Sequence, residues 1–197
     1  MSKKIFIDCG ANIGQSIIHF NTLYRDSKDY KIYSFEGNPK LISEINKIHK
    51  KLIDEGKLEV FNKVVWKKDG EIKFYISRED SLGSSTNKNK WNVNKNNYVI
   101  VESIDLSKWI KENFNKNDFI VLKMDIEGAE YEVVPHMLKT GVISYINKFY
   151  LEGHYHRILP KENQVELKKL DEEIEIECEK KYPNVLCTGQ WLGINDY

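Results

Sequence analysis

The chain has 197 residues, of which 41% are hydrophobic and 12% aromatic, so it can bury one sizeable core. We expect a single domain over residues 1–197. Thirty basic and thirty acidic side chains give a formal net charge of zero, which argues against nucleic acid or an anionic membrane as a partner.

The cysteines and the apolar runs indicate in which cellular compartment the protein is expected. Cys9, Cys178 and Cys187 are too few and too scattered for a disulfide framework or a zinc cluster, which fits a reducing environment. The first predicted strand begins almost at Met1 and leaves no room for a signal peptide, and no apolar run approaches the roughly 20 residues that span a bilayer. We therefore expect a cytoplasmic protein without a membrane span.

The first motif along the chain is the stretch KKIFIDCGANIG, which begins at Lys3. Its apolar run, IFI, is typical of a buried parallel strand, and Asp8 stands at the carboxyl end of that run. Gly10 and Gly14 allow backbone conformations or close approaches that a side chain forbids, and residues 15–24 are predicted to form a helix whose free N–H groups face the loop. The pattern predicts a nucleotide-type cradle, and the alternative is a plain strand-to-helix turn.

The spacing of the glycines narrows the choice of ligand class. The loop lacks the Lys-Ser/Thr pair of a P-loop and has two glycines where the dinucleotide fingerprint has three, which disfavours ATP and NAD. The spacing Asp-x-Gly-x-x-x-Gly resembles motif I of the Rossmann-like methyltransferases that use S-adenosyl-L-methionine (SAM), and the wording DCGANIG resembles the FkbM family of methyltransferases. This resemblance implies that Asp8, Gly10, Asn12 and Gly14 bind the cofactor, with Gly10 and Asn12 at its amino-acid end.

A second strand, predicted over residues 31–35, also ends in an acid, Glu36. In doubly wound sheets the carboxylate that closes the second strand accepts hydrogen bonds from ribose hydroxyls, about 20 residues after the glycine loop. The spacing from Gly14 to Glu36 agrees, so we favour a ribose ligand over a solvated loop acid before a helix. The FEGNP sequence is similar to the FEP-type second motif of the FkbM family, with a glycine inserted before the Asn-Pro pair.

Apolar residues at helical spacing predict one amphipathic helix over residues 39–55, and a third strand follows over residues 58–66. Right-handed crossovers place the three strands in the order 3-2-1. Asn62 and Val65 lie toward the carboxyl end of the third strand, where an adenine rests in a SAM-binding fold. Trp66 is either a further neighbour of the adenine or a core residue.

The pattern then changes to alternating polar and apolar residues over 71–77 and 98–104, which predicts an antiparallel pair of strands. Residues 80–97 between them are polar, rich in Asn and Lys, and without periodicity. A loop of this length is either disordered or functional, for example as a lid. Its Gly-Ser-Ser sequence resembles an element after the same hairpin in FkbM proteins, which implies that Ser84 and Ser85 contact the substrate.

A helix over residues 105–114, with Asp105 as its N-cap, leads to a strand over residues 119–124. This strand should lie beside the first strand, on the side away from the second, so the chain reverses direction across the sheet there. Open α/β sheets bind ligands at such a switch point. Asp125 ends the strand and should therefore share one pocket with the glycine loop.

The block KMDIEGAE, residues 123–130, closely resembles the KIDVEGAE signature of the FkbM family. We take Asp125 as a candidate catalytic residue and Glu127 as a candidate substrate ligand. The alternative for Glu127 and Glu130 is a capping role, because negative charge at a helix N-terminus is worth about 0.3–1 kcal/mol. Lys123 alternates to the same face as Asp125, and we expect it to pair with a carboxylate because an unpaired buried ammonium is costly.

Residues 146–151 predict the next strand and, if the extended backbone continues, Glu152, His154 and His156 point the same way. His154 is our candidate general base, with Asp125 or Glu152 orienting its imidazole, and Glu152 is also a candidate substrate ligand. The alternatives are a metal site made from the histidines and a carboxylate, or a surface loop that holds two histidines. We expect a site without a metal ion.

The last part of the chain shows no chemical motif. Residues 161–181 predict a charged helix, which should pack on the sheet edge through Val165, Leu167, Leu170 and Ile174. Residues 185–187 and 191–194 predict two closing strands that give the sheet an antiparallel edge.

These observations predict an α/β fold with a doubly wound, mostly parallel Rossmann-like methyltransferase sheet and an inserted antiparallel hairpin. The resemblance to the FkbM family covers about residues 3–155 and implies SAM as methyl donor and a hydroxyl of a sugar or another small molecule as acceptor. The competing hypotheses are a nicotinamide-dependent enzyme on the same fold and a non-catalytic SAM- or sugar-binding module.

Overall fold

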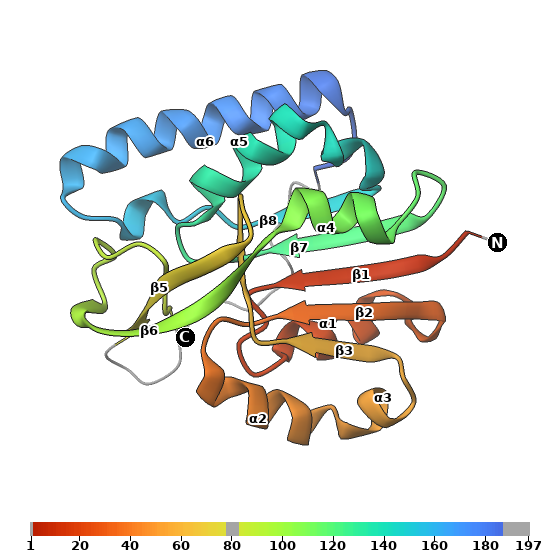
Figure 1. The fold of residues 1–197 in the computed structure, drawn as a ribbon. Helices are drawn as coiled ribbons and strands as arrows, with labels where there is room; N and C mark the ends of the chain where they lie inside the picture. Colours follow the sequence, from red (N-terminus) through yellow and green to blue (C-terminus); the bar gives the residue numbers. More distant parts are fainter. Residues whose placement is uncertain (1, 78–82, 187–197) are drawn as a thin grey trace.

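A computed structural model describes residues 2–77 and 83–186 of the chain (Figure 1). Five parallel strands form the central sheet: β1 (Lys4–Cys9), β2 (Tyr30–Phe35), β3 (Leu58–Phe61), β7 (Phe119–Met124) and β8 (Lys148–Leu151). Their order is β3-β2-β1-β7-β8, so the chain reverses direction between β1 and β7. The predicted order of the first three strands and the position of the strand over residues 119–124 are confirmed.

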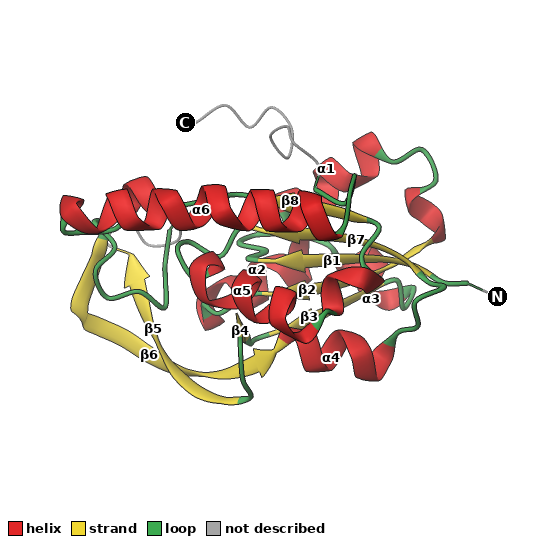
Figure 2. Cartoon of the chain, turned by 90° about the horizontal axis from the view of Figure 1, so that it is seen from above, coloured by secondary structure: helices red, strands yellow, loops and turns green. Residues whose placement is uncertain are grey.

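A smaller sheet lies at the end of the molecule toward which the central strands point (Figures 1 and 2). It contains β4 (Val64–Trp66), β5 (Gly70–Ser77) and β6 (Val93–Asp105) in the order β4-β6-β5. β5 and β6 are antiparallel, whereas β4 and β6 are parallel. The predicted inserted hairpin is confirmed, and it places a second sheet beside the carboxyl ends of β1 and β7.

Helices cover both faces of the central sheet, as a doubly wound fold requires. The α-helices among the described residues are α1 (Gln15–Leu23), α2 (Pro39–Ile48), α3 (Lys50–Asp54), α4 (Leu106–Asn113), α5 (Glu130–Thr140) and α6 (Lys161–Lys181). Three short 3-10 helices are η1 (Ser27–Asp29), η2 (Val142–Tyr145) and η3 (Tyr155–Arg157). None of the described helices is both long enough and apolar enough to span a membrane.

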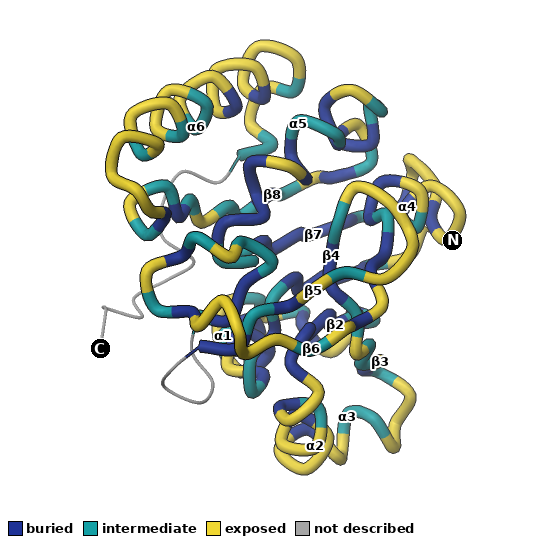
Figure 3. Tube along the Cα trace, turned by 60° about the vertical axis from the view of Figure 1, so that its left-hand side comes forward, coloured by how far each residue is buried: buried dark blue, intermediate teal, exposed yellow. Residues whose placement is uncertain are grey.

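Successive side chains of β1 point to opposite faces of the sheet, and this alternation divides the core into two layers. Ile5 and Ile7 point to the face covered by α4, α5 and α6, whereas Phe6 points to the face covered by α1. On that second face the ring of Phe6 stacks on Phe20 of α1 at a centroid distance of 4.1 Å. Figure 3 shows the central strands buried while α6 is largely exposed.

Two predicted elements are divided in the structure. The prediction of a single strand over residues 58–66 is wrong. The extended chain breaks after Phe61, and its second part, β4, joins the smaller sheet. At the break, the Asn62 amide donates to the backbone oxygens of Glu36 and Gly37. The single helix predicted over residues 39–55 is also wrong: it is interrupted at His49, whose Nε2 lies 2.9 Å from the carbonyl oxygen of Gly14.

The polar segment predicted as a loop over residues 80–97 is shorter than expected, because β6 already begins at Val93. Residues 83–92 pack against the segment after β8: the Trp91 N–H donates to the Arg157 carbonyl, and the Leu159 N–H donates to the Asn89 carbonyl. Residues 80–82 lie outside the described part of the chain.

The C-terminal part agrees with the prediction for α6 but differs in detail. Val165 is 60% exposed, so its predicted packing contact is wrong, whereas Ile174 is buried and Leu167 and Leu170 are partly buried against the core. Leu186, in the first predicted closing strand, forms a single parallel bridge to Phe149. Residues 187 and 191–194 of the predicted closing strands lie outside the described residues.

The stacked pair on the α1 face provides a test of the core. Phe20→Ala should lower the free energy of unfolding by about 3–5 kcal/mol, because it empties a fully buried aromatic site. Ile18→Ala on the same helix is the matched control, since Ile18 is 55% exposed and should change stability by no more than about 0.5 kcal/mol. Urea unfolding of the two variants measures the difference, and equal losses would contradict the packing described here.

Candidate functional site

The acid at the end of β1 lies beneath the glycine loop. Asp8 is fully buried, and its Oδ2 accepts hydrogen bonds from Ser16 Oγ at 2.5 Å and Ser34 Oγ at 3.4 Å. Its Oδ1 lies 3.6 Å from the ammonium of Lys123. Asp8 thus joins β1, β2, α1 and β7 below the loop.

The glycine loop requires a residue without a side chain at position 10. Gly10 has a φ of 81°, and a Cβ there would overlap the carbonyl oxygen of Asp125. Gly14 has a φ of 87°, and a Cβ there would meet the His49 ring. The loop is therefore in direct backbone contact with the end of β7.

Glu36, at the end of β2, faces the same loop. Its Oε2 accepts a hydrogen bond from the Asn12 N–H at 2.8 Å, and its Oε1 accepts one from the Asn38 N–H at 2.7 Å. Burial raises the pKa of Glu36 to about 7, against the lowering effect of these two backbone donors and of Lys123. Asn12 itself adopts a left-handed φ of 52°.

Lys123 connects the ends of β1 and β7. Its buried ammonium lies 3.2 Å from Asp125 Oδ2 and 3.6 Å from Asp8 Oδ1, and it donates to the Gly10 carbonyl at 2.9 Å. The predicted pairing of Lys123 with a carboxylate is confirmed. Burial alone would lower the pKa of Lys123, but the two acids outweigh it and raise that pKa.

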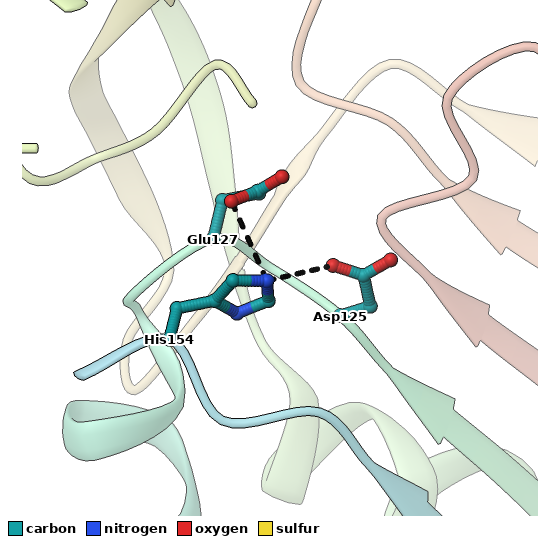
Figure 4. A group of neighbouring side chains, drawn as sticks. All are labelled: Asp125, Glu127 and His154. Atoms are coloured by element: carbon teal, nitrogen blue, oxygen red, sulfur yellow. Dashed lines mark ion pairs between the residues drawn. The ribbon is translucent and has the colours of Figure 1, made fainter. Parts of the chain in front are cut away.

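Asp125, Glu127 and His154 form a cluster beside this ion pair (Figure 4). His154 Nε2 lies 3.6 Å from Asp125 Oδ1 and 3.4 Å from Glu127 Oε2. The three ligand-type atoms lie within 4.8 Å of one another, so this group has the residue types and the spacing to hold a metal ion. Glu152 Oε1 approaches the same Nε2 at 3.5 Å from a more exposed position.

His154 is held by its other ring nitrogen. The strand ends at Leu151, as predicted, and the extended backbone does not continue beyond it. His154 lies in the turn before η3, where it is fully buried. Its Nδ1 lies 3.0 Å from Glu130 Oε1, and Glu130, the first residue of α5, also accepts hydrogen bonds from the Ile126 and Gly128 N–H groups of the turn before the helix. Burial lowers the pKa of His154, but Glu130, Glu152 and Glu127 together raise it well above its usual value.

The expected common orientation of Glu152, His154 and His156 is not found. His156 is exposed and accepts a hydrogen bond from Arg157 Nε, whereas His154 is buried among the carboxylates. The 3-10 geometry of η3 replaces the alternation of a strand, so only His154 is buried, although the two imidazole rings are stacked with their centroids 6.3 Å apart.

Glu127 is fixed by cations from two other segments. Its φ is 58°, and its Oε2 lies 2.6 Å from Lys90 Nζ and 3.4 Å from an Arg157 guanidinium nitrogen. Ser85 Oγ donates to the Glu127 carbonyl at 2.6 Å. The segment over residues 83–92 therefore reaches the cluster through Lys90 and Ser85.

One cavity joins the glycine loop to the acidic cluster. Of the predicted site residues, it is lined by Gly10, Asn12, Glu36, Val65, Ser84, Asp125 and Glu127. The others lie behind that lining or beside it: Asp8, Gly14, Asn62, Ser85, Glu152 and His154. Phe35, Val64 and Phe74 give the cavity an apolar wall near Glu36.

Three residues that organise this site were not predicted. Lys90 and Arg157 bind Glu127, and Ser16 binds Asp8. Lys90 lies in an Asn/Lys-rich segment, where one lysine cannot be distinguished from its neighbours. Ser16 offered a signal that could have been used, because it stands in the first turn of a helix that begins next to a buried acid.

Comparison with known proteins gives two matches. The sequence model of the methyltransferase FkbM domain matches residues 8–149 of the chain. A crystal structure of the methyltransferase FkbM from Methylobacillus flagellatus KT aligns at 17% identity with a TM-score of 0.49, over 88% of this chain and 36% of that one. The chain thus spans about a third of the length of that protein. No curated protein matches the chain.

The buried ion pair below the cavity can be tested by replacement of its cation. Lys123→Met should lower the free energy of unfolding by about 3–5 kcal/mol, because Asp8 and Asp125 lose their shared partner. The control is Lys50→Met, which removes an exposed pair with Asp54 that is worth at most about 0.5 kcal/mol. Chemical unfolding measures both, and a small effect of Lys123→Met would show that the pair does not hold the two loops together.

Proposed function

Because the chain belongs to the FkbM methyltransferase family, we propose that it transfers a methyl group from SAM to a hydroxyl of a sugar or another small-molecule or glycan acceptor. We treat residues 1–197 as one methyltransferase domain. The observation that carries the proposal is the single cavity lined by Gly10, Asn12 and Glu36 at one end and by Asp125 and Glu127 at the other. Donor and acceptor sites thus open into one space.

The donor end fits the chemical groups of SAM. The Glu36 carboxylate keeps lone pairs beyond the two that accept backbone N–H groups, and ribose hydroxyls donate to such an acceptor. Val65 and the apolar wall of Phe35, Val64 and Phe74 suit an adenine ring. We assign Gly10 and Asn12 to the amino-acid end of SAM, while Asp8, Gly14 and Asn62 support the loops from behind.

The acceptor end is polar and anionic. Asp125, Glu127 and Ser84 line the cavity. Carboxylates accept hydrogen bonds from hydroxyl groups, so this end suits an acceptor with several hydroxyls, such as a sugar. Ser85 and Glu152 complete the proposed substrate contacts. Ser85 acts by holding Glu127 in place, whereas Glu152 approaches the cluster from its exposed side.

SAM supplies an electrophilic methyl group on a sulfonium. The protein must hold the acceptor oxygen in line with that methyl group and take the hydroxyl proton as the oxygen–carbon bond forms. Two routes for the proton are open to the cluster. Transfer to Nε2 of His154 requires a neutral imidazole in the free protein, which the raised pKa of His154 disfavours. The other route is loss from a hydroxyl that is bound to a cation held by Asp125 and His154, where the imidazole gives up its proton when the cation binds. Both routes make His154 and Asp125 the proposed catalytic residues.

Two other functions remain distinguishable by simple measurements. A nicotinamide-dependent enzyme on this fold would bind NAD, which the two-glycine loop disfavours. A non-catalytic SAM- or sugar-binding module would bind ligand and release no demethylated product.

Donor binding should depend on Glu36 and on pH. Because the pKa of Glu36 is raised to about 7, its carboxylate is largely protonated at lower pH and ionised above that value. The affinity for S-adenosylhomocysteine should therefore rise between about pH 6 and pH 8, since the anion accepts both ribose hydroxyls. Glu36→Gln and Glu36→Ala should bind more than tenfold more weakly at the upper pH and lose most of the pH dependence.

Isothermal titration calorimetry measures these affinities. Glu59→Gln on β3 is the matched control, because Glu59 is half exposed and pairs with Lys31 rather than with the cavity. Unchanged affinity in Glu36→Ala, or tighter binding of NAD than of S-adenosylhomocysteine, would contradict the donor assignment.

Methyl transfer should require His154 but not His156. His154→Ala should lower turnover by roughly 10²–10⁴ while the affinity for S-adenosylhomocysteine is retained. His156→Ala, a change two positions away at an exposed histidine, should leave turnover unchanged. The assay follows release of S-adenosylhomocysteine and the mass of methylated product over a panel of sugars and hydroxylated small molecules, and a fully active His154→Ala would exclude His154 from the reaction.

A further inference from the structure

We propose that Asp125, Glu127 and His154 bind a divalent transition-metal ion, of which Mn²⁺ is the best match, at the acceptor end of the cavity. The residues come from three places: the end of β7, the turn after it, and the segment after β8 (Figure 4). Two of them, Asp125 and Glu127, line the cavity, so an ion between them has access to the acceptor. The sequence had suggested a site without metal.

The separation of the side chains fits a shared ion better than direct contact. His154 Nε2 lies 3.4 Å from Glu127 Oε2, 3.5 Å from Glu152 Oε1 and 3.6 Å from Asp125 Oδ1. These distances are long for hydrogen bonds, and Nε2 has no hydrogen-bond partner although the side chain is only 1% exposed. Two ligands that are each about 2.1 Å from one ion lie roughly 3.0–3.6 Å apart at angles of about 90–120°.

Each of the three ligands is oriented by a further residue. Glu130 holds Nδ1 of His154, which leaves Nε2 directed toward the two carboxylates. Lys123 holds Oδ2 of Asp125 and leaves Oδ1 on the side of Nε2. Lys90 holds Glu127 at Oε2, and a carboxylate oxygen has a second lone pair with which to bind an ion.

The charges around the cluster leave room for a divalent cation. Five carboxylates take part in this ion-pair network, those of Asp8, Asp125, Glu127, Glu130 and Glu152. Lys90, Lys123 and Arg157 supply three positive charges. With His154 protonated, the described network carries one uncompensated negative charge. With the neutral imidazole that metal ligation requires, it carries two, which a divalent ion would balance.

The types of ligand atom in the cluster favour some divalent ions over others. Mg²⁺ prefers oxygen ligands in a near-ideal octahedron, so the nitrogen of His154 disfavours it. Imidazole suits the transition metals, whereas carboxylate and water ligands suit Mn²⁺. Two carboxylates, one imidazole and open positions for water or substrate thus favour Mn²⁺ over Mg²⁺.

The role of the ion rests on the proposed methyl transfer, whereas the binding site itself does not. An acceptor hydroxyl on an open position of the ion becomes more acidic, and Glu152, at the exposed side, can take its proton. The acceptor oxygen then forms its bond to the methyl carbon as the carbon–sulfur bond breaks. The electron pair of that bond stays on sulfur, which becomes a neutral thioether.

Manganese binding to the full chain tests the proposal without an activity measurement. Titration with Mn²⁺, followed by loss of the electron paramagnetic resonance signal of the free ion, should show one site of micromolar affinity and much weaker competition by Mg²⁺. His154→Ala and Glu127→Gln should weaken Mn²⁺ binding at least tenfold, whereas His156→Ala should bind as the unmodified chain does. Absence of binding at millimolar Mn²⁺, or equal affinity in His154→Ala, would overturn the site.

A second measurement, made on the unmodified chain, tests the metal site even if the variants do not fold. Electron spin echo spectroscopy of the bound Mn²⁺ should show coupling to one imidazole nitrogen, and its absence would contradict ligation by His154. The proposed function is tested separately by binding of S-adenosylhomocysteine and by methyl transfer. Transfer at full rate in the presence of a chelator would remove the ion from the reaction, and Mn²⁺ binding without any methyl transfer would leave the metal site and reject the function.

Discussion

The buried ammonium of Lys123 is the interaction on which the rest of the site depends. It lies between the acids that end β1 and β7 and also donates to the Gly10 carbonyl, so one cation fixes two strand ends and the loop between them. Without it, the fully buried Asp8 carboxylate and the partly exposed Asp125 carboxylate would lose their shared cation, which costs several kcal/mol. The same contact sets the side of Asp125 that faces His154. The glycine loop and the acidic cluster therefore share one electrostatic support.

The parallel core was predictable because its signals are local. Each central strand is a short apolar run, and β7 was predicted with the observed bounds. The two divided elements were not predictable because polar side chains bind backbone groups far away in the sequence. Asn62 donates to the carbonyls after β2, and His49 contacts the carbonyl of Gly14. The apolar pattern continues through both breaks, so periodicity alone favours one strand and one helix.

The positions of the candidate site residues were predictable to different degrees. Glu36 and Asp125 end parallel strands, and topology alone brings such residues to one edge of the sheet. The burial of His154 was not predictable, because it depends on a 3-10 turn and on contact with Glu130. Lys90 reaches Glu127 from a polar segment that packs against the chain after β8, a contact that no local pattern encodes.

The geometry of Gly10 links the two ends of the cavity more closely than the ion pair alone. Its backbone approaches the Asp125 carbonyl so closely that no side chain fits, and the Asp125 N–H in turn donates to the Cys9 carbonyl at 3.1 Å. The loop assigned to the donor and the acid assigned to the acceptor are thus parts of one hydrogen-bonded unit. Methyl transfer requires donor and acceptor atoms to be aligned to within a fraction of an ångström, and rate falls steeply when that alignment is lost. In the proposed reaction, a rigid backbone contact between the two binding regions would supply this alignment, so substitutions at position 10 should act on turnover as well as on stability.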